Sequence, residues 1–290
     1  MDFTTQFVRA KNPCAQGYRW FVRHHQQGGD YQQVLDALVD DGRVDDACWL
    51  LDQFGPTSAV LKLSAIEAEA VVFAGSIEVS GAIEVGSMLR AGRSIRAGGG
   101  IRAGGAIMAG DDIQAGAAVR TGDKLHSGGD IRCEGSIETK GAIRTGGGLR
   151  VAWDVTCGGS FDAVDNVLVG QDLLVEGPIV CGKGLHVRGA ISASDSIRAG
   201  HGIVCGASVC CAMHLEAGLG IKAAESIIAG GSIRAGESLS AGQDLRAGTG
   251  YGIFAGLCVQ HEAWDSSALV CAGARPERLM SGCWAGVCLV

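Results

Sequence analysis

Seven histidines are the side chains best suited to proton transfer near neutral pH in this 290-residue chain. They are His24, His25, His126, His186, His201, His214 and His261. Acid–base or nucleophilic catalysis would require one of them in a fixed geometry with a carboxylate and a nucleophile. His126 and His186 fall on outward positions of a six-residue repeat, and His201 and His214 fall at its corners. We expect all four to be solvated surface residues, and we predict no catalytic residue.

Twelve cysteines raise the possibility of a disulfide framework or a zinc site. Five of them instead occupy one small-residue position of the repeat, which is otherwise filled mainly by alanine and valine: Cys133, Cys157, Cys181, Cys205 and Cys211. A free cysteine packs as a small hydrophobe, so we interpret these five as core residues. The C-terminal set matches no closed pattern of zinc ligands: Cys258, Cys271, Cys283 and Cys288. No metal and no cofactor is predicted.

Acidic residues at the corners of the repeat could suggest calcium binding: Asp111, Asp112, Asp130, Asp154 and Asp172. The Gly-rich nonapeptide that binds calcium in some β-solenoid proteins is missing. Aspartate is common in turns because its carboxylate accepts hydrogen bonds from nearby backbone amides. We therefore expect these residues to be structural.

The element that positions all these side chains is a strict repeat. From Ile77 to Leu245 a large apolar residue returns at every sixth position, and a small residue follows two positions later. Residues i and i+2 face the same side of a strand, so each repeat predicts one short strand with a large and a small inward side chain. A corner, often glycine, closes each repeat. Three such sides per turn predict an all-β solenoid, a triangular parallel β-helix of about ten turns with a filled interior.

Both ends of the chain depart from this rhythm. Residues 1–57 predict a small N-terminal helical module of three helices, with Asp30 capping a helix that starts at residue 31. Val60, Ile66 and Val72 begin the strand pattern out of register with Ile77, as expected of a first coil that receives the helices as a cap. We divide the chain into a helical cap (1–57), the β-helix (58–257) and a C-terminal cap or arm (258–290).

Composition limits the possible partners. The net charge of −7 argues against a protein that neutralises many phosphates, so we expect no nucleic-acid partner. The first residues lack the pattern of a secretory signal, and no apolar run reaches the length of a membrane span. A cytoplasmic location is the expectation.

The segments SIRAGGGIRAGGAIMAG, SIRAGHGIVCG and SIRAGESLSAG resemble the repeats of bactofilin-type β-helices over about residues 60–257. That resemblance implies a right-handed triangular helix and a cytoskeletal polymer joined end to end. Left-handed hexapeptide acyltransferases are less similar, because they favour glycine after the aliphatic residue, where this chain often has arginine. They also have a loop that leaves the coil and a histidine between subunits.

Outward positions that carry apolar residues are the candidate partner surface. The early outward positions are rich in arginine, whereas one middle turn has Leu168, Leu174 and Val180. The candidate surface residues are these three with Trp153, Val204, Cys210 and Ile228. Exposed apolar groups that cluster mark protein contacts, and Trp153 would be the natural aromatic anchor.

These observations predict a non-catalytic bacterial protein-interaction solenoid that acts through a protein partner or self-association. A scaffold and a toxin-neutralising binder both suit such a body. Two alternatives stay open: a bactofilin-like self-assembling structural polymer, and a degenerate hexapeptide acyltransferase.

Overall fold

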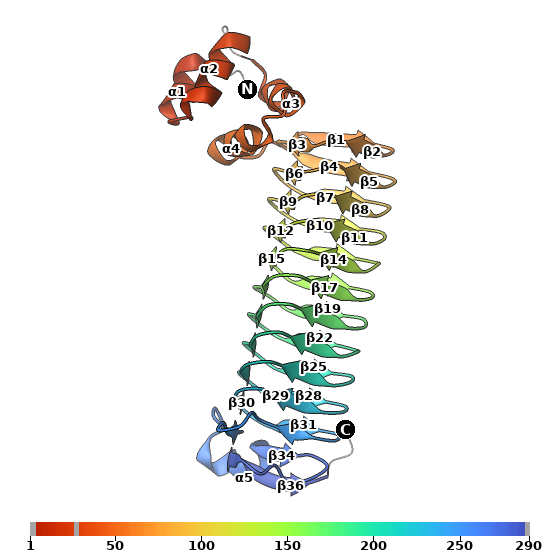
Figure 1. The fold of residues 1–290 in the computed structure, drawn as a ribbon, viewed down its shortest axis with the longest axis vertical. Helices are drawn as coiled ribbons and strands as arrows, with labels where there is room; N and C mark the ends of the chain where they lie inside the picture. Colours follow the sequence, from red (N-terminus) through yellow and green to blue (C-terminus); the bar gives the residue numbers. More distant parts are fainter. Residues whose placement is uncertain (1–3, 26–28, 288–290) are drawn as a thin grey trace.

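The computed structural model describes residues 4–25 and 29–287, which form a long three-sided β-solenoid with helices at its N-terminal end (Figure 1). All strands within the three sheets are parallel, and between β4 and β32 each pairs with the strand 18 residues away. This confirms the predicted all-β parallel solenoid. The first sheet has 13 strands, so the coil makes about 13 turns and not about ten. The additional turns lie before Ile77 and after Leu245, outside the strict repeat.

The first sheet contains, in spatial order, β1 (Val60–Leu63), β4 (Ser76–Val79), β7 (Ile95–Ala97), β10 (Ile113–Ala115), β13 (Ile131–Cys133), β16 (Leu149–Val151), β19 (Val167–Val169), β22 (Leu185–Val187), β25 (Ile203–Cys205), β28 (Ile221–Ala223), β31 (Leu239–Ala241), β34 (Leu269–Cys271) and β36 (Cys283–Gly286). The second sheet contains β2 (Ile66–Ala68), β5 (Ile83–Val85), β8 (Ile101–Ala103), β11 (Val119–Thr121), β14 (Ile137–Thr139), β17 (Val155–Cys157), β20 (Leu173–Val175), β23 (Ile191–Ala193), β26 (Val209–Cys211), β29 (Ile227–Ala229) and β32 (Leu245–Arg246). The third sheet contains β3 (Val71–Phe73), β6 (Leu89–Ala91), β9 (Ile107–Ala109), β12 (Leu125–Ser127), β15 (Ile143–Thr145), β18 (Phe161–Ala163), β21 (Ile179–Cys181), β24 (Ile197–Ala199), β27 (Leu215–Ala217), β30 (Ile233–Ala235), β33 (Ile253–Phe254) and β35 (Leu279–Ser281).

The inward residues of the three sheets fill one continuous core. In each three-residue strand from β5 to β31 the first and third side chains are buried and the middle one points outward, as in β10 and β14. The large and small inward residues stack on their equivalents in the next coil. Burial of these apolar columns provides the main stabilisation of the rod.

Glycine recurs at the corners because adjacent coils approach each other closely there. A Cβ atom on Gly128 would lie 1.9 Å from the carbonyl oxygen of Gly110, and one on Gly104 would lie 1.9 Å from that of Gly86. No real Cβ approaches an oxygen so closely, so the corner would have to move. The glycines thus allow the corner backbones to stack at the strand spacing.

The first coil is shorter than the later ones. Leu61 pairs with Ile77, Ile66 with Ile83 and Val71 with Leu89, so the inward series is Leu61, Ile66 and Val71. The assignment of Val60 and Val72 to that series was wrong. Val72 points outward and is nevertheless buried, because it packs in the helical cluster.

Four helices precede the solenoid, one more than expected: α1 (Thr5–Ala10), α2 (Ala15–His24), α3 (Tyr31–Asp40) and α4 (Val44–Phe54). Asp30 caps α3 as predicted, since its carboxylate accepts hydrogen bonds from the amides of Gln32 and Gln33. None of the described helices is long and apolar enough to cross a membrane.

The helices attach to the third sheet through β3. The Gln32 side chain donates to the carbonyl of Val72 at 3.0 Å and accepts from the amide of Ala74 at 2.9 Å. Arg90 pairs with Asp52 at the same junction. The helices therefore cover one side of the first coil, and Figure 1 shows them on the side of the rod that carries β3.

The other two sheets end at an open edge. β1 and β2 are terminal strands of their sheets, so each has a strand neighbour on one side only. Val60 and Leu63 are 45% and 46% exposed, although Leu63 pairs with the buried Val79. The helices thus contact β3, and the Phe73 side chain of that strand belongs to the core.

The C-terminal end of the rod is closed by irregular chain. After β32 the strict spacing ends, but β33 and β35 extend the third sheet, and β34 and β36 extend the first. Trp284 packs against the core, and α5 (Trp264–Ser267) lies beside β34. This final segment covers the last regular coil.

Replacing Ile137 by Asp tests the assignment of inward and outward faces. Ile137 is 1% exposed, so the carboxylate would be buried without a partner, and we expect a loss of at least about 3 kcal/mol of folding free energy. The control is Glu138→Gln on the same strand, which removes a surface ion pair with Arg120 and costs about 1 kcal/mol or less. Urea denaturation distinguishes them, and equal midpoints would contradict the assignment.

Candidate functional site

Polar side chains at the corners form hydrogen-bond ladders along the rod. The residue just before a strand accepts a hydrogen bond from the equivalent backbone amide one coil further on. Asp130 N donates to Asp112 Oδ1 at 2.8 Å, and Gly148 N donates to Asp130 Oδ1 at 2.9 Å. Asp154 and Asp172 do the same at another corner. These aspartates are structural as expected, but their partners lie in the next coil and not in the local turn.

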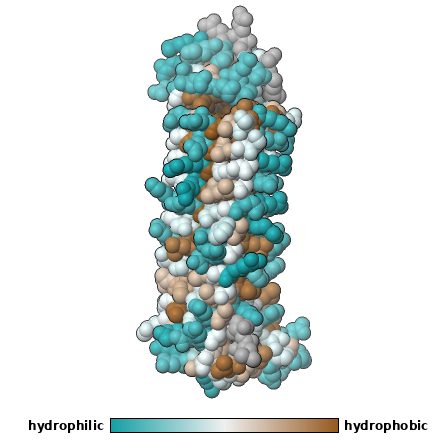
Figure 2. All heavy atoms as spheres, turned by 90° about the vertical axis from the view of Figure 1, so that its right-hand side faces the viewer, coloured by the Kyte–Doolittle hydropathy of each residue, from teal (hydrophilic) through white to brown (hydrophobic). Residues whose placement is uncertain are grey.

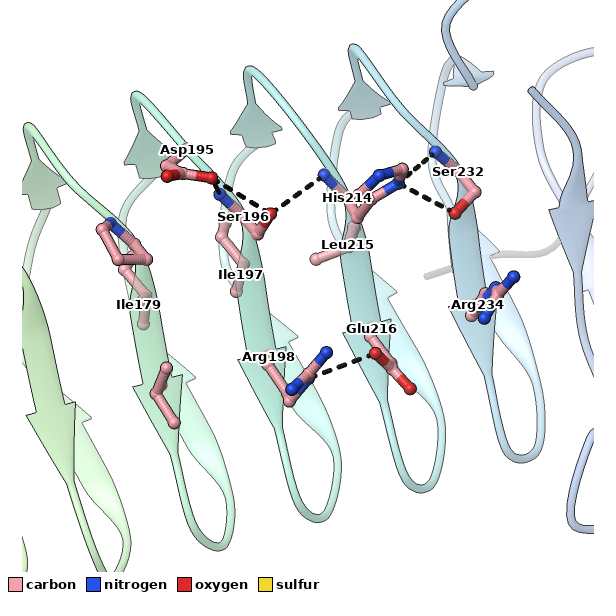
Figure 3. Close-up of a pocket in the computed structure, with 12 residues that line it drawn as sticks. Ile179, Asp195, Ser196, Ile197, Arg198, His214, Leu215, Glu216, Ser232 and Arg234 are labelled. Carbon is pink, nitrogen blue, oxygen red and sulfur yellow. Dashed lines mark hydrogen bonds and ion pairs between the residues drawn. The ribbon is translucent and has the colours of Figure 1, made fainter. Parts of the chain in front are cut away.

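His214 belongs to one of these ladders (Figure 3). Its backbone N donates to Ser196 Oγ at 3.4 Å, and its ring Nδ1 accepts from the backbone N of Ser232 at 3.1 Å. The ring is half-buried and meets Tyr251 edge to face. The expectation that His214 is a solvated surface residue was wrong, because it fills the role that aspartate has at other corners.

Serine, histidine and aspartate, the residue types of a catalytic triad, lie close together around His214. The hydrogen bonds between them differ from those of a triad. A hollow of about 360 Å³ is lined by both neighbouring serines, Asp195 and the Arg198–Glu216 ion pair, among others (Figure 3). Ser232 Oγ lies 3.1 Å from His214 Nδ1, but the backbone amide already occupies that nitrogen. Asp195 bonds Ser196 and not the imidazole. The serine, histidine and aspartate are therefore not connected in the order that a catalytic triad has.

The remaining histidines of the repeat differ in exposure. His186 and His201 are exposed as expected, whereas His126 is half-buried. Burial, with Lys124, Arg144 and Arg90 nearby, lowers the pKa of His126. Across residues 4–25 and 29–287, no three His, Cys, Asp or Glu side chains lie together as metal ligands would.

The five cysteines of the small inward series are buried free thiols, as predicted. Their S–H groups donate to backbone carbonyls, as Cys157 does to Gly141 O at 3.3 Å. Burial raises the pKa of each thiol, that of Cys211 to about 11. They are inert core residues.

Cys258 and Cys283 are also free, Cys271 is disulfide-bonded, and Cys288 lies outside the described residues.

The candidate partner residues fall on all three faces. On the first sheet Leu168 and Val204 flank His186, and on the third sheet Val180 lies between Asp162 and Arg198. On the second sheet the outward residues of four adjacent coils form an uncharged column: Leu174, Ser192, Cys210 and Ile228. One flat partner cannot cover all three faces.

The uncharged column differs from the charged positions before it. On the second sheet, nearer the helices, Arg120 and Glu138 form an ion pair across adjacent coils. Within the column Leu174 is 48% exposed, and the other three side chains are half-buried. Figure 2 shows brown, apolar groups among teal ones along one side of the rod, in its lower, C-terminal half as well as near the helical end. This column could be covered without removing a charged group from water.

Trp153 lies at the edge of the rod where the first and second sheets meet. It lies at the corner between β16 and β17 and is 53% exposed. In the next coil, Leu168 and Leu174 lie on the strands that flank the equivalent corner. The structure thus groups these three candidates around one edge of the rod, whereas Val180 is on the third sheet.

Two hollows that sequence reasoning missed lie on either side of Leu168. One has a volume of about 460 Å³ and includes Arg150, His186 and Arg188; the other, of about 490 Å³, includes Arg132 and Asn166. Arg150 and Leu168 line both hollows. The 18-residue register could have placed Arg150 beside Leu168, but no sequence pattern marks Arg188 as part of the same hollow.

The fold and its surface define a class: a parallel three-sheet β-solenoid with an N-terminal helical domain and outward-facing candidate contacts. Residues 1–55 match the family model of the YdhT N-terminal domain, which covers the helices and none of the strands. No curated protein and no solved structure matches the chain. The family match therefore concerns the helical part of the chain alone.

Substitution of His214 tests the corner ladder. His214→Ala leaves the Ser232 amide without its acceptor, and we expect a loss of about 1–3 kcal/mol of stability. His214→Asn should lose less, because Asn166 holds the amide of Gly184 at 3.0 Å at another corner. Urea unfolding and hydrogen exchange at the Ser232 amide measure both effects. Equal losses in the two variants would show that the acceptor is unimportant.

Proposed function

We propose that this chain is a non-catalytic bacterial protein-interaction rod, acting in the cytoplasm as a scaffold or as a toxin-neutralising binder. The observation that carries the proposal is the uncharged column of the second sheet, Leu174, Ser192, Cys210 and Ile228. The core is full, so binding has to use the outside of the coil or its ends. The column is the face where desolvation costs least.

The column alone is too small for a stable interface. Four coils span roughly 15 Å along the rod, whereas stable interfaces bury about 800 Å² on each partner. A partner on the second sheet would therefore extend around the edge at Trp153, which is exposed and adjoins the column. Exposed tryptophan is a frequent anchor of protein interfaces. Either a second copy of this chain or a different protein could bind through this edge and the uncharged column.

Replacing two residues of the column tests the proposal. Leu174→Arg together with Ile228→Arg should reduce association by at least about tenfold, because two charges would lose water on binding. Both side chains are outside the core, so the fold should be retained. Sedimentation gives the mass of the purified chain, and capture from bacterial lysate compares retained proteins.

Val180→Arg is the matched control, since it adds an arginine to the third sheet at a similarly exposed apolar position. It should leave mass and captured proteins unchanged. Circular dichroism establishes folding of each variant. A folded double variant that associates like the parent protein would remove the second sheet from consideration.

One observation favours the alternative of a bactofilin-like self-assembling polymer. β1 and β2 end at open edges, and Val60 and Leu63 are exposed beside them. Unpaired strand edges readily pair with another chain. Under this alternative, rods would join through these edges and the uncharged column would be incidental.

Electron microscopy of the purified chain distinguishes the two proposals. The interaction-rod proposal expects discrete particles at micromolar concentration. The polymer alternative expects filaments, which should disappear in Val60→Lys with Leu63→Lys because charge at an edge opposes strand pairing. Filaments that require the edge would overturn the interaction-rod proposal.

A further inference from the structure

We propose that the hollow between Arg150 and Arg188 on the first sheet binds an acidic side chain, with a neighbouring large apolar residue, from a linear segment of a partner protein. The hollow of about 460 Å³ is lined by Leu168, Ala152 and Gly170 as well as the two arginines. This inference rests on the proposed function, because it states the chemistry of a protein partner. It uses a different sheet from the uncharged column.

The arginines of this hollow differ from most others on the rod. Twelve arginines lie between residues 77 and 246, and eight of them form ion pairs. Arg234 lies over the ring of Phe254. Arg102, Arg150 and Arg188 have neither kind of partner among the described residues, and two of these three line one hollow. Such a pair provides donors that a carboxylate can satisfy.

The acids around the hollow do not cancel this charge. On the other side of Leu168, Asp130 pairs with Arg132 at 2.8 Å and Asp165 pairs with Lys183 at 2.9 Å. Glu134 lines the hollow and forms no ion pair in the described part of the chain. With two arginines and one glutamate, the hollow has a formal charge of one positive unit. That charge suits a single carboxylate better than a polyanion.

The apolar surroundings specify the rest of the segment. Leu168 is 36% exposed and forms one wall, and Trp153 is exposed at the corner next to Ala152. A large apolar side chain beside the carboxylate would cover this surface. Arg150 and Arg188 belong to coils two steps apart, about 10 Å along the rod. An extended segment lying along the rod reaches both.

Selection from a displayed library of random linear peptides tests the inference, with the intact purified chain as target. We expect enriched peptides to contain Asp or Glu within a few residues of a large apolar residue. A synthetic copy of such a peptide should bind Arg150→Glu with Arg188→Glu at least about tenfold more weakly, since the charged hydrogen bonds are lost and the new carboxylates repel the acidic side chain. Added salt should also weaken its binding to the parent chain.

Arg102→Glu with Lys140→Glu is the matched control, because it makes the same change in net charge away from the hollow. Both variants should keep the parent's circular dichroism and melting temperature, and the control should keep the parent's affinity. Enrichment without an acidic bias, failure to enrich any peptide, or equal binding to both double variants would overturn the inference. The Leu174→Arg and Ile228→Arg variant should still bind the peptide, so failure of the uncharged column is distinguishable from failure of this hollow.

Discussion

The constraint on which the structure depends is the register between coils. Every strand of the regular coil must place its amides and carbonyls opposite those of the strand 18 residues away, as in Ile113, Ile131 and Leu149. One inserted residue would turn inward side chains outward for the rest of that strand. Corner glycines follow from the same constraint, since Gly128 leaves no space for a Cβ above Gly110. The corner ladders through Asp130 and His214 satisfy amides that the coil spacing leaves without a backbone partner.

Because of this constraint, the positions that maintain the fold and the positions that are free to contact a partner are different residues of each repeat. The inward and corner positions are determined by packing, so residues such as Cys157 and Asp172 that look chemically active have structural roles. The outward middle residue of each strand from β5 to β31 is not part of the core. It can be arginine, as at Arg120, or leucine, as at Leu174, with the same fold. The outward surface is therefore free to vary along the rod while the core stays constant.

The solenoid and its outward columns could be predicted from the sequence, because both depend on the six-residue repeat between Ile77 and Leu245. Sequence reasoning failed where contacts are not periodic. Val72 is buried by helices that no repeat places, and the open edges of β1 and β2 depend on how far those helices reach. The hollow between Arg150 and Arg188 was missed because it joins an outward position to a corner two coils away. His214 was misread because a ladder role usually belongs to shorter side chains.

The rod also fixes distances between surfaces that could act together. Six coil steps separate β2, beside the helical end, from β20, which carries Leu174, and this corresponds to about 29 Å. A flexible linker would allow a range of separations, whereas stacked parallel strands hold one. The helical domain and the middle of the rod are thus held at a defined spacing and orientation. A partner that touched both would gain from the preset geometry, because its second contact would form at high effective concentration. Under the proposed function, the strict repeat between them would be a spacer whose length contributes to recognition.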